Sequence, residues 1–127
     1  MKVLLDTSVL IWWLSEPDRI SSQVLAELQE PESILLFSQM SLLEIQIKTA
    51  LKKLKFDFPV RDIPGMAEDS GLTPLRFSNE AIFMLSTLPD VHRDPFDRLL
   101  ICEAIQEGVA VVTPDKTFGL YPVRVIW

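Results

Sequence analysis

The segment from Asp94 to Ile105 constrains the fold of this chain more than any other. It begins as helices do, with Asp94 at the capping position and Pro95 at the first helical position. Asp97 follows three residues after the cap, where an acid suits the first turn of a helix. The segment is therefore predicted to be a helix, and Asp94 is interpreted as its cap.

One carboxylate of this predicted helix lies on its apolar side. At about 100° per residue, Asp97 falls inside the stripe formed by Leu100, Ile101, Ala104 and Ile105. A charged carboxylate among apolar side chains costs several kcal/mol unless a partner compensates it. Because capping alone does not require an inward-facing side chain, the pattern favours a functional site at Asp97.

Length and composition indicate one domain with one core. The chain has 127 residues, 48% of them hydrophobic, so residues 1–127 are predicted to form a single domain. The uncharged apolar runs are too short to span a bilayer, and Asp6 comes too early for a signal peptide. Cys102 is the only cysteine and is interpreted as a small core residue rather than a nucleophile. We therefore expect a cytoplasmic protein with no membrane partner.

The net charge of −6 argues against broad electrostatic binding of nucleic acid, which favours a basic surface. Metal binding would alter this balance, because two divalent ions on clustered acids would bring the charge to about −2. An acidic chain can therefore still act on nucleic acid if its carboxylates hold metal.

Short apolar segments alternate with helical patterns along the chain. Strands are expected at residues 3–5, 33–37, 72–77, 109–112 and 123–126, and helices at 7–14, 24–29, 38–54, 63–70, 81–88 and 94–107. This alternation predicts an α/β fold with a parallel sheet covered by helices on both faces. Right-handed crossovers would then place every strand-to-helix junction at one edge of the sheet.

Acidic residues stand at or near these junctions. Asp6 directly follows the first strand, and Asp115 lies just beyond the fourth. Asp6 could simply cap a helix, and Asp115 could belong to an ordinary turn. However, ligands of open α/β sheets bind at this edge. Glu44 lies in the first turns of the helix after the second strand. Its position is explained equally well by a solvent-exposed ion pair with Lys48 and by a functional site.

Four carboxylates gathered at one edge would repel each other and raise each other's pKa values. Mg²⁺ or Mn²⁺ would relieve the repulsion, because hard cations prefer oxygen ligands. Near a phosphate such ions can orient and activate a water, which implies phosphodiester hydrolysis without a protein nucleophile. The chain has no His/Cys cluster for zinc and no Gly-rich phosphate loop. Its only histidine, His92, is expected to be a loop residue rather than a ligand.

Four segments together carry a family resemblance. They are Leu4–Leu10, Ser38–Lys48, His92–Ile101 and Val112–Phe118, in this order and spacing. With them the chain resembles, essentially from end to end, the PIN-domain ribonucleases, and most closely the VapC-type toxins of prokaryotic toxin–antitoxin systems. Leu43 stands where relatives often carry Trp, and Cys102-Glu103 replaces a small-plus-polar pair. Neither departure involves the acids.

The resemblance implies a PIN-like three-layer α/β/α sandwich with a central parallel sheet of four to five strands. It also implies an endoribonuclease that requires Mg²⁺ or Mn²⁺, hydrolyses RNA, and acts as the toxin of a type II toxin–antitoxin pair. A homodimer and a cognate antitoxin that covers the site are the implied partners. The catalytic and metal-binding acids would be Asp6, Glu44, Asp97 and Asp115, supported by Ser8, Thr113 and Asp94. Asp94 could, besides capping, pair with Arg93 or Arg98.

Other classes of function remain open from the sequence. A receiver-like phosphoacceptor domain would need an acid pair after the first strand and an aspartate after a middle strand, but the chain offers Asp6 and Phe37-Ser38. A haloacid-dehalogenase phosphatase would need Asp-x-Asp where the chain reads Asp6-Thr7-Ser8. A non-catalytic PIN-like binding module is the third alternative, and it predicts that the loss of any single acid is tolerated.

Overall fold

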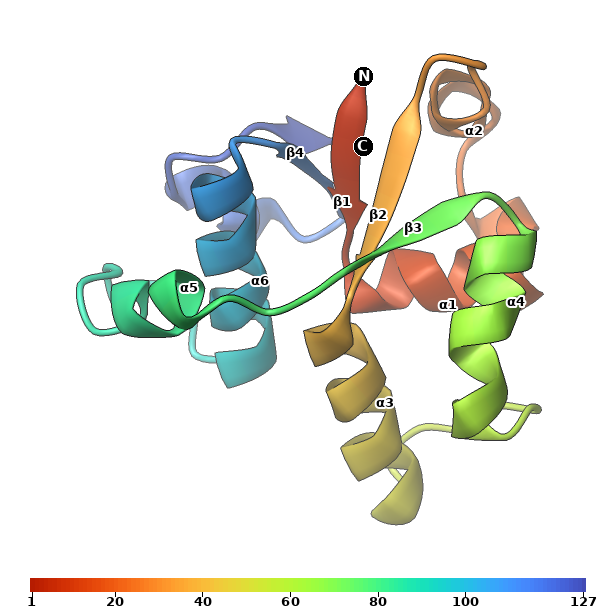
Figure 1. The fold of residues 1–127 in the computed structure, drawn as a ribbon, viewed down its shortest axis with the longest axis horizontal. Helices are drawn as coiled ribbons and strands as arrows, with labels where there is room; N and C mark the ends of the chain where they lie inside the picture. The colour runs from red at the N-terminus through yellow and green to blue at the C-terminus, as the bar shows by residue number, and fades with distance from the viewer.

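Five parallel strands form the centre of the molecule in a computed structural model that describes residues 1–127 (Figure 1). The strands are β1 (Lys2–Leu5), β2 (Ile34–Ser38), β3 (Leu72–Leu75), β4 (Ala110–Val112) and β5 (Val125–Ile126). Their order across the sheet is β3-β2-β1-β4-β5, and each neighbouring pair is parallel. The predicted parallel sheet is confirmed, with β1 in its middle.

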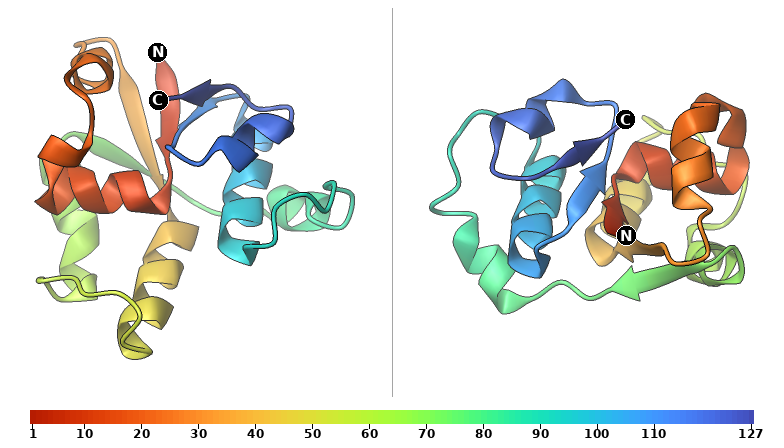
Figure 2. Two further views of the ribbon diagram at one scale, coloured as in Figure 1. Left: turned by 180° about the vertical axis from the view of Figure 1, so that it is seen from behind. Right: turned by 90° about the horizontal axis from the view of Figure 1, so that it is seen from above.

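Helices cover both faces of this sheet (Figures 1 and 2). They are α1 (Thr7–Ser15), α2 (Ser22–Leu28), α3 (Gln39–Ala50), α4 (Ile63–Asp69), α5 (Asn79–Met84) and α6 (Pro95–Glu107). Three short 3-10 helices lie in the connections, η1 (Pro17–Arg19), η2 (Val60–Asp62) and, between β4 and β5, η3 (Lys116–Leu120). Helices α1, α2 and α4 lie on one side of the sheet and α5 and α6 on the other, which confirms the predicted three-layer α/β/α architecture.

The alternation of side chains along β1 explains why both faces are covered. Val3 and Leu5 point into a core shared with α1, α2 and α4, and Leu4 points into a second core shared with α6. All three side chains are fully buried. A strand that buries every side chain has no solvent face, so helices on both sides are required.

Two helices end earlier than the sequence predicts. Helix α3 ends at Ala50 rather than near residue 54, because the N–H groups of Lys53 and Leu54 both turn back to the Lys48 carbonyl and Lys52 adopts a φ of 57°. Helix α5 ends at Met84 rather than at residue 88. The hydroxyls of the following Ser86 and Thr87 hydrogen-bond to carbonyls of the last turn.

The carboxyl ends of three neighbouring strands lie together and create the functional edge. The Asp6 N–H donates to the Val112 carbonyl over 3.0 Å, so the residue after β1 lies beside the end of β4. On the other side of β1, strand β2 ends at Ser38, which starts α3. None of the helices combines the length and the apolar composition that crossing a bilayer requires.

Candidate metal centre

Asp6 serves the helix and the site at once. Its Oδ1 accepts the Val9 N–H over 2.7 Å and caps α1, while its Oδ2 accepts the Thr113 hydroxyl over 2.5 Å. The side chain is buried, at 6% exposure. The predicted cap is confirmed, and the second oxygen lies at the edge of the sheet where the site is predicted. Thr113 lies directly after β4, where its contact with Asp6 ties the ends of two strands together.

Asp94 is the cap of α6, as its position in the sequence indicates. Its Oδ1 accepts the N–H groups of Phe96 over 2.9 Å and of Asp97 over 3.4 Å. The suggested pairing with Arg98 is wrong. The Arg98 guanidinium points toward the loop before α6, where it donates to the Pro89 carbonyl over 3.0 Å. Backbone carbonyls of this loop need donors, and the arginine supplies them.

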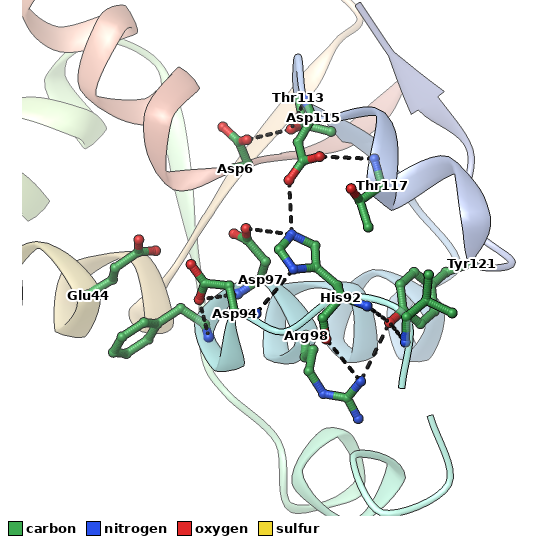
Figure 3. Close-up of polar contacts among 12 residues, drawn as sticks. Asp6, Glu44, His92, Asp94, Asp97, Arg98, Thr113, Asp115, Thr117 and Tyr121 are labelled. Carbon is green, nitrogen blue, oxygen red and sulfur yellow. Dashed lines mark hydrogen bonds and ion pairs between the residues drawn. The ribbon is translucent and has the colours of Figure 1, made fainter. Parts of the chain in front are cut away.

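Asp97 lies on the first turn of α6 and faces the other acids (Figure 3). Its Oδ2 is 3.0 Å from Nε2 of His92. Asp115 approaches the same imidazole nitrogen from the loop after β4, with its Oδ2 at 2.9 Å. Its other oxygen accepts the Thr117 N–H over 2.9 Å, which fixes the carboxylate. Two acids that are 18 positions apart in the chain therefore converge on one histidine.

His92 is a loop residue, as predicted, but its ring lies within the acid cluster rather than outside it. Nδ1 accepts the Asp94 N–H over 3.1 Å, so in the neutral ring the proton is on Nε2. That nitrogen then faces the carboxylates of Asp97 and Asp115. The Tyr121 hydroxyl accepts the His92 backbone N–H over 2.7 Å and fixes the loop. The position of His92 two residues before a helix cap is the sequence signal that could have revealed it.

Glu44 is paired with Lys48, as predicted, and is also buried. It is buried, at 5% exposure, and its Oε2 forms an ion pair with Lys48 one turn along α3. Its Oε1 is buried with no hydrogen-bond partner. Burial shows that this pair is not simply a solvated surface pair. Lys48 belongs to the surroundings of the site, because burial alone would lower its pKa but Glu44, Asp94 and Asp97 together raise it.

The structure brings the four predicted acids to one edge of the sheet, two of them in a tight group and two beside it. Ligand atoms of His92, Asp97 and Asp115 all lie within 4.8 Å of one another. Asp6 and Glu44 lie outside this tight group, but their charges act on it and on each other. Figure 3 shows carboxylates from α3, α6, the end of β1 and the loop after β4 around one region.

The acids of this cluster have strongly altered pKa values. Burial, together with the charges of Asp94 and Glu44, raises the pKa of Asp97 to about 7. Burial raises the pKa of Asp6 to about 6, although hydrogen bonds from Thr113 and Val9 oppose the change. For Asp115, burial alone would raise the pKa, but hydrogen bonds from Thr117 and His92 lower it overall. The cluster therefore holds protons at neutral pH when no cation is bound.

Two hydroxyl-bearing residues at the start of α1 differ in burial and contacts. Ser8, the predicted supporting residue, is exposed and makes no hydrogen bond to any of the acids. Thr7 is buried instead, and its hydroxyl donates to the Ser41 hydroxyl over 2.9 Å, which connects α1 to α3. Thr7 lies one turn before the buried Leu10, a helical spacing that could have identified it.

The donor set fits a hard divalent cation. It consists of carboxylate oxygens, and it includes the buried Glu44 Oε1 that no protein group satisfies. Burial is the main cause of the raised pKa values of Asp6 and Asp97, and the charges of neighbouring carboxylates add to it. A thiolate-rich zinc site is excluded, since the single cysteine is buried in the core.

Replacing Asp97 with asparagine is expected to stabilise the metal-free protein. The pKa of this carboxyl rises from 3.8 to about 7 on folding, so its ionised form destabilises the folded state increasingly as pH rises through this window. At pH 8 in EDTA, Asp97→Asn should unfold with a free energy about 2 kcal/mol higher than the wild type, whereas at pH 4 the two should match.

The measurement is thermal unfolding at both pH values, with Asp57→Asn as the control because Asp57 is exposed and distant in sequence from the site. A melting temperature of Asp97→Asn that is equal to or below that of the wild type at pH 8 would count against repulsion in the cluster.

Comparisons with known proteins show the family and the fold of this chain. A family model described as the PIN domain matches residues 3–122. Ribonuclease VapC22 of Mycobacterium tuberculosis is 27% identical over 118 residues, which cover 90% of this chain and 87% of that protein.

Solved structures share the fold at low sequence identity. VapBC2 from Rickettsia felis, bound to a DNA fragment from its promoter, has a chain that matches with a TM-score of 0.72 and 19% identity, covering 99% of this chain and 98% of that one. VapBC-1 from nontypeable Haemophilus influenzae matches with a TM-score of 0.70 and 18% identity, covering 99% of this chain and 97% of that one.

Proposed function

The chain belongs to the PIN-domain family, and on this premise we propose that it is a divalent-metal-dependent endoribonuclease acting as the toxin of a type II toxin–antitoxin pair. The observation that carries the proposal is the convergence of acids from four distant segments on one edge of the sheet. The relative named Ribonuclease VapC22 supports RNA as the substrate.

Asp6, Asp97, Asp115 and Glu44 would hold Mg²⁺ or Mn²⁺ in this proposal, while the neighbouring His92 positions two of these carboxylates. When bound, such an ion lowers the pKa of a water and neutralises charge on the leaving oxygen of a phosphodiester. Thr113 holds Asp6 in place by donating to its Oδ2. Asp94 supports the site by capping α6, the helix that presents Asp97.

Lys48 and His92 reduce the cost of gathering these acids. Lys48 pairs with one oxygen of Glu44 and leaves the other without a partner. His92 donates its Nε2 proton between Asp97 and Asp115. The carboxylates are thus held close together before a cation arrives, which limits the reorganisation that metal binding requires.

An antitoxin and a second copy of the chain are the proposed protein partners. The chain's structural relatives include VapBC complexes, which supports an antitoxin. A hollow of about 690 Å³ runs along α3, the helix that carries Glu44. Apolar residues (Met40, Leu42, Leu43, Val60) and polar ones (Gln39, Gln46, Arg61) contribute to its lining. We propose that a segment of the antitoxin packs there. The homodimer rests on the family resemblance, and a cytoplasmic location is consistent with a lone, buried cysteine.

A receiver-like domain is not favoured by the topology. Receivers belong to the doubly wound sheets with strand order 2-1-3-4-5, whereas the order here is β3-β2-β1-β4-β5. The non-catalytic binding module shares the observed fold and differs only in tolerating the loss of single acids. Mutation of the acids therefore separates it from the proposed nuclease.

Expression of this chain alone is expected to arrest bacterial growth, and co-expression of the neighbouring upstream open reading frame is expected to restore it. The reason is that RNA cleavage by a free toxin stops translation, whereas a bound antitoxin covers the site. The measurement is colony formation after induction, with Asp97→Asn as a control that should be harmless by itself. Growth that continues unaffected at a confirmed level of folded wild-type protein would contradict the toxin role.

A further inference from the structure

One buried acid of α6 belongs to no part of the proposed site. Glu103 lies six residues beyond Asp97 and is only 2% exposed. Its Oε1 accepts the hydroxyl of Ser38, while its Oε2 is buried without a hydrogen-bond partner. The hollow beside it, which Leu75, Arg76 and Glu107 help to line, is too tight for a water molecule. Nothing visible in the core compensates this carboxyl except the serine.

Burial raises the pKa of Glu103 to about 7, and the charge of Glu107 adds to the rise, although the Ser38 hydrogen bond opposes it. The other charged group near it is Arg76, which follows β3 and is exposed. When it is ionised, a buried carboxyl of this kind lowers the stability of the folded state. A functional role would explain why an acid stands at this position.

The hydrogen-bond partner of Glu103, Ser38, connects it to α3. It is fully buried, ends β2 and caps α3, because its Oγ accepts the Met40 N–H over 2.9 Å. The same hydroxyl donates its only proton to Glu103. A single hydroxyl therefore links the start of α3 to the middle of α6, two helices that contact each other (Figure 1). Glu44 follows Ser38 by six residues on α3, and Asp97 precedes Glu103 by six on α6.

We propose that Glu103 is a positioning residue, which through Ser38 fixes α3 against α6 and thereby sets the placement of Glu44 relative to Asp97. The proposal rests on the proposed function only in treating these two acids as metal-binding. It assigns a role to an acid outside the cluster. Loss of the contact would let the two helices shift and would weaken the cation site without removing any of its ligands.

The test compares Glu103→Ala with Glu103→Gln, since the amide oxygen of glutamine keeps the acceptor for Ser38. Binding of Mn²⁺ alone, measured by calorimetry at pH 8, should weaken by about tenfold or more in Glu103→Ala and stay within about twofold of the wild type in Glu103→Gln. Glu107→Ala, an exposed change one turn along α6, is the control and should leave binding unchanged. Equal Mn²⁺ affinity of Glu103→Ala and the wild type would overturn the proposal, even if Glu103→Ala melts lower.

A second measurement does not need metal, so it separates this proposal from the nuclease proposal. If the wild type binds no Mn²⁺, the metal mechanism fails, and the link is judged from unfolding free energies in EDTA. Ser38→Ala and Glu103→Ala should then be clearly non-additive in the double variant, because each removes the same contact. Additive effects would show that Ser38 and Glu103 act independently and would reject the positioning role.

Discussion

Asp97→Asn and Asp6→Asn are each expected to lower the rate of divalent-metal-dependent RNA cleavage by at least about 100-fold while the protein stays folded. Asparagine keeps the size of the side chain but removes the charge that binds a cation. Asparagine is close to aspartate in size, and at residue 6 its oxygen can still cap α1. The loss should therefore come from the site and not from unfolding.

The measurement is cleavage of a mixed cellular RNA substrate, followed with purified wild type and variants side by side. Circular dichroism and melting temperature report the fold of each variant. Asp57→Asn is again the matched control, since it removes an exposed aspartate and should cleave as the wild type does. Wild-type cleavage by both site variants would favour the non-catalytic binding module, or a contaminating nuclease.

Removing divalent cations is expected to have an equally large effect. EDTA should abolish cleavage by the wild type, and excess Mg²⁺ or Mn²⁺ should restore it, because the acids alone offer no nucleophile activated for phosphodiester hydrolysis. Mn²⁺ at about 100 times its Kd should also stabilise the wild type by roughly 2.7 kcal/mol, and Asp97→Asn by much less. Full cleavage in EDTA would refute the metal mechanism.

The pKa values of the acids give this prediction a pH dependence with a defined sign. Asp6 and Asp97, with pKa values of about 6 and about 7, must lose their protons before they can bind a cation. Metal affinity and metal-dependent stabilisation should therefore rise from pH 5 to pH 8. Calorimetric titrations with Mn²⁺ at several pH values test this, and a pH-independent affinity would contradict the assignment of these carboxyls as ligands.

The fold and the acids of the site could be read from the sequence for specific physical reasons. Fully apolar runs such as Val3-Leu4-Leu5 need two covering layers, which predicts a parallel sheet between helices. Asp97 was detectable because a helix has a fixed angular period, and its charge fell on the apolar side. Asp6 was detectable because parallel strands end at a common edge.

The remaining features depend on contacts that sequence spacing does not encode. The ring of His92 reaches the cluster only because the loop before α6 is fixed by Tyr121, which is 29 residues away. The burial of Glu44 depends on how α3 packs near α6. The sequence alone therefore could not decide whether Glu44 forms an exposed ion pair or belongs to a site. The early end of α5 reflects hydroxyls that compete locally for carbonyls, a small energy difference that periodicity does not reveal.

The central claim is that Asp6, Asp97 and Asp115, brought from distant parts of the chain, hold one divalent cation site together with Glu44. Anomalous diffraction from crystals grown with Mn²⁺ tests it most directly, because it locates the ion independently of any assay. The account predicts a manganese peak at coordination distance from carboxylate oxygens of Asp97 and at least one of the other three acids, and no such peak in Asp97→Asn. A well-ordered cluster without manganese at saturating concentration, or a peak bound elsewhere on the molecule, would contradict it.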